Sequence, residues 1–205
     1  MKNLEKVVSK IEAELDEKDE VREVALKSSR AVIRLSGSIL RGLHRKEKVS
    51  EQFETLRDEV SRLLGLLVDH PDIAVAGYIE SAFQEYAEAG IMISLLEKDD
   101  VPSPEDLGIG GVPYLLGLAD SVGELRRFCL DELKSGKVEK ANRYLEKMED
   151  IFTELMRFDY PEAILPVKRK QDIVRSLLEK TRGEVAVAAS TRKLHERLDE
   201  VLRDK

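Results

Sequence analysis

Long stretches with helical periodicity, broken at the prolines, constrain the fold of this chain more than any other feature. The six prolines fall where helices would be expected to break: Pro71, Pro102, Pro104, Pro113, Pro161 and Pro166. Between them, apolar residues recur every three to four positions, and no segment shows the alternation typical of strands. The pattern therefore predicts an all-α fold.

The helical pattern divides the chain into eight segments. We predict helices near residues 3–17, 19–46, 50–68, 72–97, 112–134, 138–157, 161–181 and 184–202. Whether the first two are continuous stays open. The longest irregular stretch, 98–112, is predicted to be a loop with one helical turn beginning at Ser103 and Pro104. Neighbouring helices are expected to pack antiparallel in a bundle.

Composition limits the architecture and the setting of the protein. With 205 residues, 42% of them hydrophobic, the chain can bury one sizeable core, so we predict a single domain over 1–205. Charged residues make up 37% and aromatic residues 5%, which favours solvated helices over sheets.

Cys129 stands alone, so no intramolecular disulfide is expected. No apolar run has the length of a membrane span, and the charged start is unlike a secretory signal; we therefore expect a cytoplasmic protein without a membrane partner.

The segment 21–48 predicts a basic surface in a chain whose net charge is −7. Five of its cations share an arc of about 60° on a helix, and His44 adds to them. We call this set the basic stripe: Lys27, Arg30, Arg34, Arg41, His44 and Arg45. Apolar residues lie on the opposite face: Val21, Ala25, Val32, Leu35, Ile39 and Leu43. A row of like charges favours a polyanion lying along it, with a solvated face as the alternative.

A second group of cations lies further along the chain. It comprises Lys168, Arg169, Lys170, Arg175, Lys180 and Arg182, against the acids Asp172 and Glu179. Two separate basic helices in an acidic chain favour a shaped binding surface for nucleic acid.

Two pairs of acids stand inside otherwise apolar helical stretches. Glu85 and Glu88 are the only charged residues between positions 81 and 96, and Asp120 and Glu124 are the only ones between 112 and 125. Spacings of three and four residues put each pair on one helix face. Ionised carboxylates are costly to bury unless a cation meets them, and a hard divalent ion such as Mg²⁺ prefers oxygen ligands. If the helices pack side by side, four acids converge; partial exposure at a helix edge is the alternative.

Other chemistries find no support in the sequence. A di-iron carboxylate bundle needs Glu-x-x-His pairs, and none of the three histidines stands in one. The histidine spacings do not suggest a zinc site. The glycine-rich stretch 108–111 lacks the preceding strand and following lysine of a phosphate-binding loop, and there is no Gly-x-Ser-x-Gly motif.

Several motifs, in order and over nearly the whole chain, resemble the translin and translin-associated factor X family. They are SSRAVIRLSGSILRGLHR, FQEYAEA, GLADSVGELRR and FDYPEAILPVKRKQDIVRSLLEKTRGEV. The match is closer to the factor X branch, whose acidic motif falls on QExxE at 84–88 and ADxxGE at 119–124.

The resemblance implies an all-α fold of about seven helices, assembly into closed, roughly octameric shells, and binding of single-stranded RNA, with single-stranded DNA as a further ligand. It also implies a Mg²⁺-dependent endoribonuclease, with Mn²⁺ as a substitute, in which Glu85, Glu88, Asp120 and Glu124 hold the metal and carry the catalysis. A translin-like protein that binds nucleic acid without cutting it is the alternative. A helical scaffold without a nucleic-acid partner is a further one.

Overall fold

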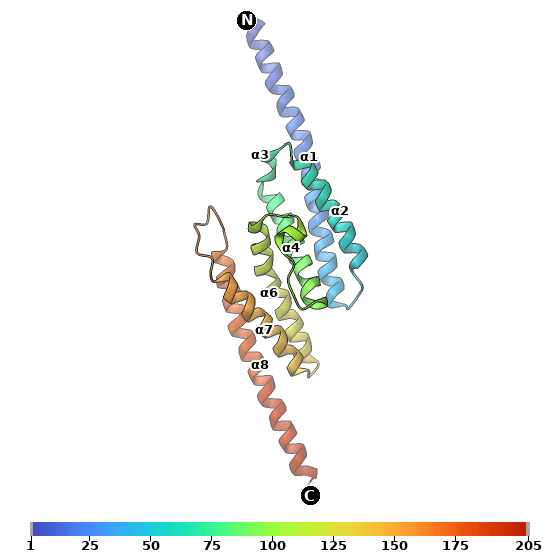
Figure 1. Cartoon of the computed structure of the whole chain (residues 1–205), viewed down its shortest axis with the longest axis vertical. Coiled ribbons are helices and arrows are strands. Elements are labelled where there is room, and N and C mark those ends of the chain that lie inside the picture. Colours follow the sequence, from blue (N-terminus) through green and yellow to red (C-terminus); the bar gives the residue numbers. More distant parts are fainter. Residues whose placement is uncertain (1, 204–205) are drawn as a thin grey trace. The chain divides into compact units, whose positions relative to one another are not determined.

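The structure, a computed structural model, describes residues 2–203 and contains only helices as regular elements within them. Their order is α1 (Lys2–His44), α2 (Ser50–Leu67), α3 (Pro71–Ala74), α4 (Gly77–Glu97), α5 (Pro104–Leu107), α6 (Gly111–Lys134), α7 (Val138–Leu155) and α8 (Lys168–Arg203) (Figure 1). The prediction of an all-α fold is therefore confirmed. None of the helices in residues 2–203 combines the length and apolarity that a bilayer span requires.

The helices group into two compact units that divide inside α4, between Gly90 and Ile91. We call the N-terminal one unit 1 and the C-terminal one unit 2. The prediction that the whole chain is one domain stays a prediction.

Unit 1 is built on α1 and α2, which pack along each other. On α1, Ala25, Val32 and Ile39 have no exposed surface, so the apolar face predicted from the sequence is the buried one. On α2 the buried residues recur at helical spacing: Leu56, Val60, Leu63 and Leu67. The ring of Phe53 on α2 stacks on Tyr86 of α4, with centroids 5.9 Å apart.

The first five turns of α1 extend beyond the end of α2 (Figure 1). Every residue from 3 to 20 is exposed, although apolar residues recur there at helical spacing. The apolar set is Leu4, Val7, Val8, Ile11 and Leu15, each about half exposed. α1 is thus one continuous helix, which answers the question that the sequence left open.

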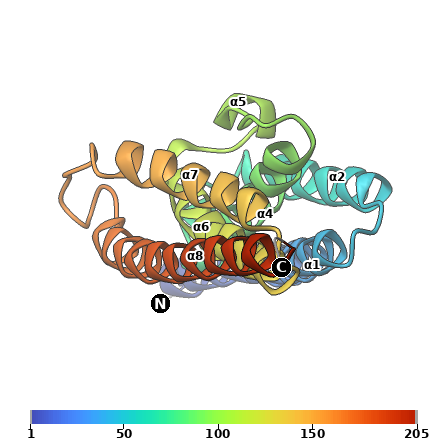
Figure 2. The ribbon, with the colours of Figure 1, turned by 90° about the horizontal axis from the view of Figure 1, so that it is seen from below.

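Unit 2 is a three-helix arrangement of α6, α7 and α8. The connection between α6 and α7 is only residues 135–137, which makes these neighbours antiparallel. Gly136 in this connection has a φ of 71°, the left-handed conformation expected at a helix end. α8 runs along α7 (Figure 2) and then extends beyond both partners, so that its apolar residues past position 186 are largely exposed.

Two predicted boundaries are wrong. The segments 161–181 and 184–202 form one helix, α8, which begins at Lys168 and passes through Gly183 without a break. The segment before it makes turns instead, in which the amides of Ile164 and Leu165 bind the carbonyl oxygen of Pro161. The buried Leu165 and Val167 anchor this segment to the core, so α8 starts only after it.

The predicted helix 72–97 is also interrupted, at residues 75–76 between α3 and α4. By contrast, α5 confirms the predicted single turn after Ser103. The Ser103 hydroxyl accepts the Asp106 amide, and the Asp106 carboxylate accepts the Ser103 amide, which completes a capping box.

Candidate metal and nucleic-acid site

The first acidic pair lies on the part of α4 that belongs to unit 1. Glu88 is 8% exposed and is surrounded along the helix by fully buried residues, whereas Glu85, one turn earlier, is half-buried. Tyr86 between them is buried against Phe53, and this burial raises the pKa of its phenol. Of the groups on this helix, the two carboxylates are therefore the candidates for holding a cation at neutral pH.

The second acidic pair lies on α6 in unit 2, and both members have a cation beside them. Lys170 Nζ on α8 is 2.5 Å from Asp120 Oδ1, and the two side chains are 23% and 30% exposed. Arg127 Nη1 is 4.0 Å from Glu124 Oε2, one turn along α6. The pair is thus partly withdrawn from water and already meets positive charge from the protein.

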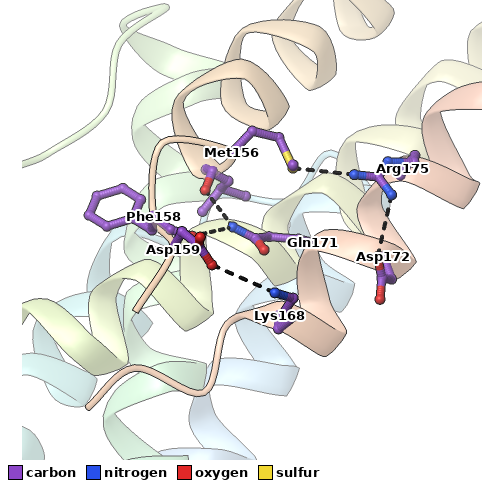
Figure 3. A network of polar contacts seen from close by, with 8 residues as sticks. Met156, Phe158, Asp159, Lys168, Gln171, Asp172 and Arg175 are labelled. Atoms are coloured by element: carbon purple, nitrogen blue, oxygen red, sulfur yellow. Dashed lines mark hydrogen bonds and ion pairs between the residues drawn. The ribbon is translucent and has the colours of Figure 1, made fainter. Parts of the chain in front are cut away.

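The first turn of α8 is fixed by the residues around Lys170. The side-chain amide of Gln171 donates to the carbonyl oxygens of Leu155 and Phe158, both at 2.8 Å, and Gln171 is 6% exposed (Figure 3). Lys168 Nζ lies 3.6 Å from Asp159 Oδ1 in the preceding connection. These contacts fasten the start of α8 to the end of α7 and so direct Lys170 toward α6.

The acids are suitable ligands for a divalent cation, but each pair alone supplies fewer ligands than a complete site. Each helix brings two carboxylates together, and carboxylate oxygens are the donors that Mg²⁺ prefers. Within residues 2–203 no group of three or more His, Cys, Asp or Glu side chains could hold a metal ion. Mg²⁺ is often held by only one or two carboxylates together with water and phosphate, so each pair fits as a partial site. Convergence of all four acids stays a prediction.

The basic stripe is exposed on α1. Its members Lys27, Arg30, Arg34, Arg41 and Arg45 are all exposed, and His44, the last residue of α1, is half-buried. Arg45 Nη1 lies 3.9 Å from Glu47 Oε1, at a distance that leaves it largely solvated. The stripe is therefore accessible along its length, as a surface for phosphates must be.

The second basic group is less cationic than its composition suggests. Four of its members lie beside acids: Lys168 by Asp159, Lys170 by Asp120, Arg175 by Asp172, and Arg182 by Glu149. The Arg182 pair, at 2.6 Å, joins α8 to α7. Part of its charge is thus met within unit 2, while Lys168, Arg175 and Arg182 remain exposed, and its role as a second binding surface stays a prediction.

Cys129 has no exposed surface, and burial raises the pKa of its thiol to about 11. A thiol of this kind is neither a nucleophile nor a metal ligand at neutral pH, because both roles need the thiolate. Cys129 therefore acts as a small apolar residue in the core of unit 2.

The sequence did not reveal Lys170 and Gln171 as parts of the site. Lys170 was named only as a member of the second basic group, and Gln171 was not singled out. The signal that could have found them is the helical register, since Gln171 shares a face with the buried Val174 and Leu178 and must therefore have its amide satisfied.

Comparison with known proteins gives the family. The Translin family model matches residues 2–182. A protein of Methanocaldococcus jannaschii, MJ0175, is 36% identical over 191 residues, which are 91% of this chain and 85% of that protein.

Solved structures agree in fold. Apo-NeC3PO has a TM-score of 0.81 at 22% identity, over 88% of this chain and 96% of that one. AfC3PO has a TM-score of 0.75 at 27% identity, over 90% and 98%. AfC3PO in complex with duplex RNA gives 0.72 at 27%, over 90% and 97%. Since the family model covers most of the sequence and a relative exceeds one-third identity, this protein belongs to the Translin family.

Proposed function

We propose that this protein is a metal-dependent endoribonuclease that cuts single-stranded RNA. Glu85, Glu88 and Asp120 would hold Mg²⁺, with Glu124 as a further ligand or as an acceptor for water around the ion. When bound, Mg²⁺ or its substitute Mn²⁺ would supply activation of water and stabilisation of the charge that develops on the phosphate.

The observation that carries this proposal is the burial of Glu88. A carboxylate that is 8% exposed in the apolar part of α4 must have its charge compensated, and buried acids in such surroundings are often functional. Glu85 lies one turn away and is only partly buried, so the pair can reach both the interior and the solvent. This is the arrangement expected of residues that hold an ion at the border of a binding surface.

RNA as the substrate has support from two sides. AfC3PO forms a complex with duplex RNA, and it is 27% identical to this protein over 90% of the present chain. The exposed cations of the basic stripe on α1 provide phosphate contacts that need not read the bases, so weak sequence preference is expected. Because the RNA in the AfC3PO complex is a duplex, the test must compare cleavage of single-stranded RNA with cleavage of duplex RNA.

The protein's own groups have separate tasks in this proposal. The basic stripe holds the phosphates of the strand, while the carboxylates of Glu85 and Glu88 accept the cation. No histidine is required as a base, because the cation itself makes water acidic.

The test is cleavage of end-labelled single-stranded and duplex RNA with Mg²⁺, compared between the native protein and Glu88→Gln. The amide keeps the shape of the side chain but removes the charge, so cleavage should fall by about a hundredfold or more while gel shifts show unchanged RNA binding. Glu80→Gln is the matched control, since Glu80 lies on the same helix and is exposed. Cleavage that persists in excess EDTA, or in Glu88→Gln, would contradict the metal-dependent mechanism.

A non-catalytic RNA-binding protein is the second candidate. It is favoured by one observation: Lys170 already neutralises Asp120, so in unit 2 an acid of the proposed site has a structural partner. Retention of RNA without any turnover in Mg²⁺ or Mn²⁺ would support this candidate.

Self-association into a closed shell, with eight subunits by analogy to the family, accompanies the proposal. The helix ending near Leu96 does not offer the interface, because most of it is buried within this chain. Exposed apolar residues at the start of α1 and the end of α8 support it instead: Leu4, Val8, Ile11, Leu15, Leu194, Leu198, Val201 and Leu202.

A further inference from the structure

Lys170 contacts Asp120, one of the proposed metal ligands, although a lysine is not itself a ligand for the metal. The ammonium lies 2.5 Å from the carboxylate, within charge-assisted hydrogen-bond distance. Both side chains are more than two-thirds withdrawn from solvent, so the interaction is less screened than a surface pair. Asp120 therefore holds a cation in the absence of any metal.

Lys170 is held in this position by its neighbours and not by the ion pair alone. Gln171, the next residue, fills two carbonyl acceptors at the end of α7 with a buried side chain (Figure 3). Arg175, one turn later, lies 5.9 Å from the ring of Phe152 on α7. The backbone of Lys170 is thus fixed, whereas its four-carbon stem has several rotatable bonds by which the ammonium can change position.

A divalent cation that binds Asp120 meets this ammonium at close range. The Lys170 ammonium occupies Oδ1 of Asp120, and a divalent ion on the same carboxylate would be repelled by this nearby positive charge, so the ammonium disfavours binding of the ion. Resting on the proposed function, we propose that Lys170 is the internal counter-ion of Asp120, which a divalent cation must displace in order to bind. Lys170 then sets the affinity of the site for the metal and keeps Asp120 compensated when the metal is absent.

The lysine is suited to this exchange. Its ammonium is a compact, strongly hydrated charge on a flexible stem, so it can leave the carboxylate by rotation of side-chain bonds without a shift of the backbone. An arginine in its place would bind the carboxylate through two parallel hydrogen bonds and would be harder to displace. Lys170→Arg should therefore weaken metal binding, whereas Lys170→Gln should strengthen it.

The experiment is a titration of the full-length protein with Mn²⁺ alone, without RNA, followed by electron paramagnetic resonance. In Lys170→Gln the Mn²⁺ affinity should rise about five- to tenfold, because one cation no longer competes. Lys168→Gln is the matched control: it removes the same charge from the same turn of α8, but Lys168 lies beside Asp159. Its Mn²⁺ affinity should stay within about twofold of the native value. Asp120→Asn should weaken binding.

A second measurement separates this role from a purely structural one. Without metal, Lys170→Gln should lower Tm, because Asp120 loses this ammonium, and saturating Mg²⁺ should restore more of the Tm than it adds to the native protein. A link that only joins α6 to α8 would lower Tm equally with and without Mg²⁺.

The outcomes distinguish the two proposals. If Asp120→Asn abolishes Mn²⁺ binding but Lys170→Gln leaves the affinity unchanged or lower, the counter-ion role is overturned and the metal site stands. If the native protein binds no Mn²⁺, or binds it independently of Asp120, both the counter-ion role and the proposed metal site are overturned.

Discussion

Arg126 and Glu184 meet through two parallel hydrogen bonds of 2.8 and 2.9 Å, which join α6 to α8 in unit 2. The same guanidinium also donates to the hydroxyl of Thr181, one turn earlier on α8. The Arg126 side chain is 17% exposed, against 43% for Glu184. Paired geometry and partial burial make this the kind of ion pair that contributes to stability.

We expect Glu184→Gln to lower the free energy of unfolding by about 1 kcal/mol, because the partly buried guanidinium loses its anionic acceptor. Urea unfolding followed by circular dichroism measures the change. Arg157→Met is the control: Arg157, in the turn after α7, forms an exposed pair with Glu154 near the end of that helix, and its loss should leave stability unchanged. Equal losses in the two variants would show that burial and paired geometry do not matter here.

Two glycines in unit 1 should respond to alanine in opposite directions. At Gly42, near the end of α1, an added Cβ would lie 2.8 Å from Cγ1 of Val49, a stiff, buried side chain. Gly65 is exposed on α2, and nothing lies within 4 Å of the atom that alanine would add there. Gly42→Ala should therefore destabilise by about 1–3 kcal/mol.

Gly65→Ala should stabilise by about 0.5–1 kcal/mol, since alanine loses less backbone entropy in a helix. Thermal and urea unfolding of the two variants measure both changes. Destabilisation by Gly65→Ala would contradict the helical environment assigned to it.

The sequence predicts most of the helices because their apolar periodicity is decided locally. It placed the start of the last helix too early, because Pro161 suits the first turn of a helix as well as a loop. The choice is made by burial of Leu165 and Val167, a tertiary effect that no local pattern contains. The predicted division between 161–181 and 184–202 is wrong for a similar reason: Gly183 costs little in a helix compared with the packing of a long one.

The candidate site was predictable only in part. The exposure of the basic stripe and the burial of Glu88 can be predicted, because residue spacing along a helix shows which side chains share its polar or apolar face. The partner of Asp120 does not, because Lys170 is 50 residues away and reaches it only through the packing of α8 on α6. The sequence shows such a lysine as one charge among several on a basic helix.

Cys129 gives a prediction at alkaline pH. Burial raises the pKa of its thiol in the folded protein to about 11, above the ordinary value of 9.0. Between these values the unfolded chain has lost a proton that the folded protein still holds, so stability falls as the pH rises. Below pH 9 the contribution is fully present.

The free energy of unfolding should therefore decline more steeply between pH 9 and 11 in the native protein than in Cys129→Ala, when both are measured by urea unfolding. The native thiol should also react with a disulfide reagent only as fast as the protein unfolds. Rapid modification at pH 8 would contradict its burial.

The basic stripe should govern the salt dependence of RNA binding. In Arg30→Gln combined with Arg34→Gln, the slope of log affinity against log salt should become shallower by about 1.4 for single-stranded RNA, since each lost phosphate contact removes about 0.7. Fluorescence anisotropy over a salt series measures it. The charge-matched control is Lys193→Gln with Arg197→Gln. Both residues are exposed on α8, outside the basic stripe, and their loss should leave the slope unchanged.

The exposed apolar residues at the start of α1 should carry self-association. Residues 3–20 hold seven acids against three lysines, so the charged face keeps this segment soluble while its apolar face stays open to a second copy. Ile11→Glu with Leu15→Glu should lower the mass found by light scattering toward the 23.2 kDa of one chain, without loss of helix signal, because both side chains are exposed. Glu12→Gln with Glu14→Gln changes the same turn on its charged side and should leave the mass as it is. An unchanged mass in the apolar variant would move the interface away from α1, and a native protein already at the mass of one chain would remove the shell altogether.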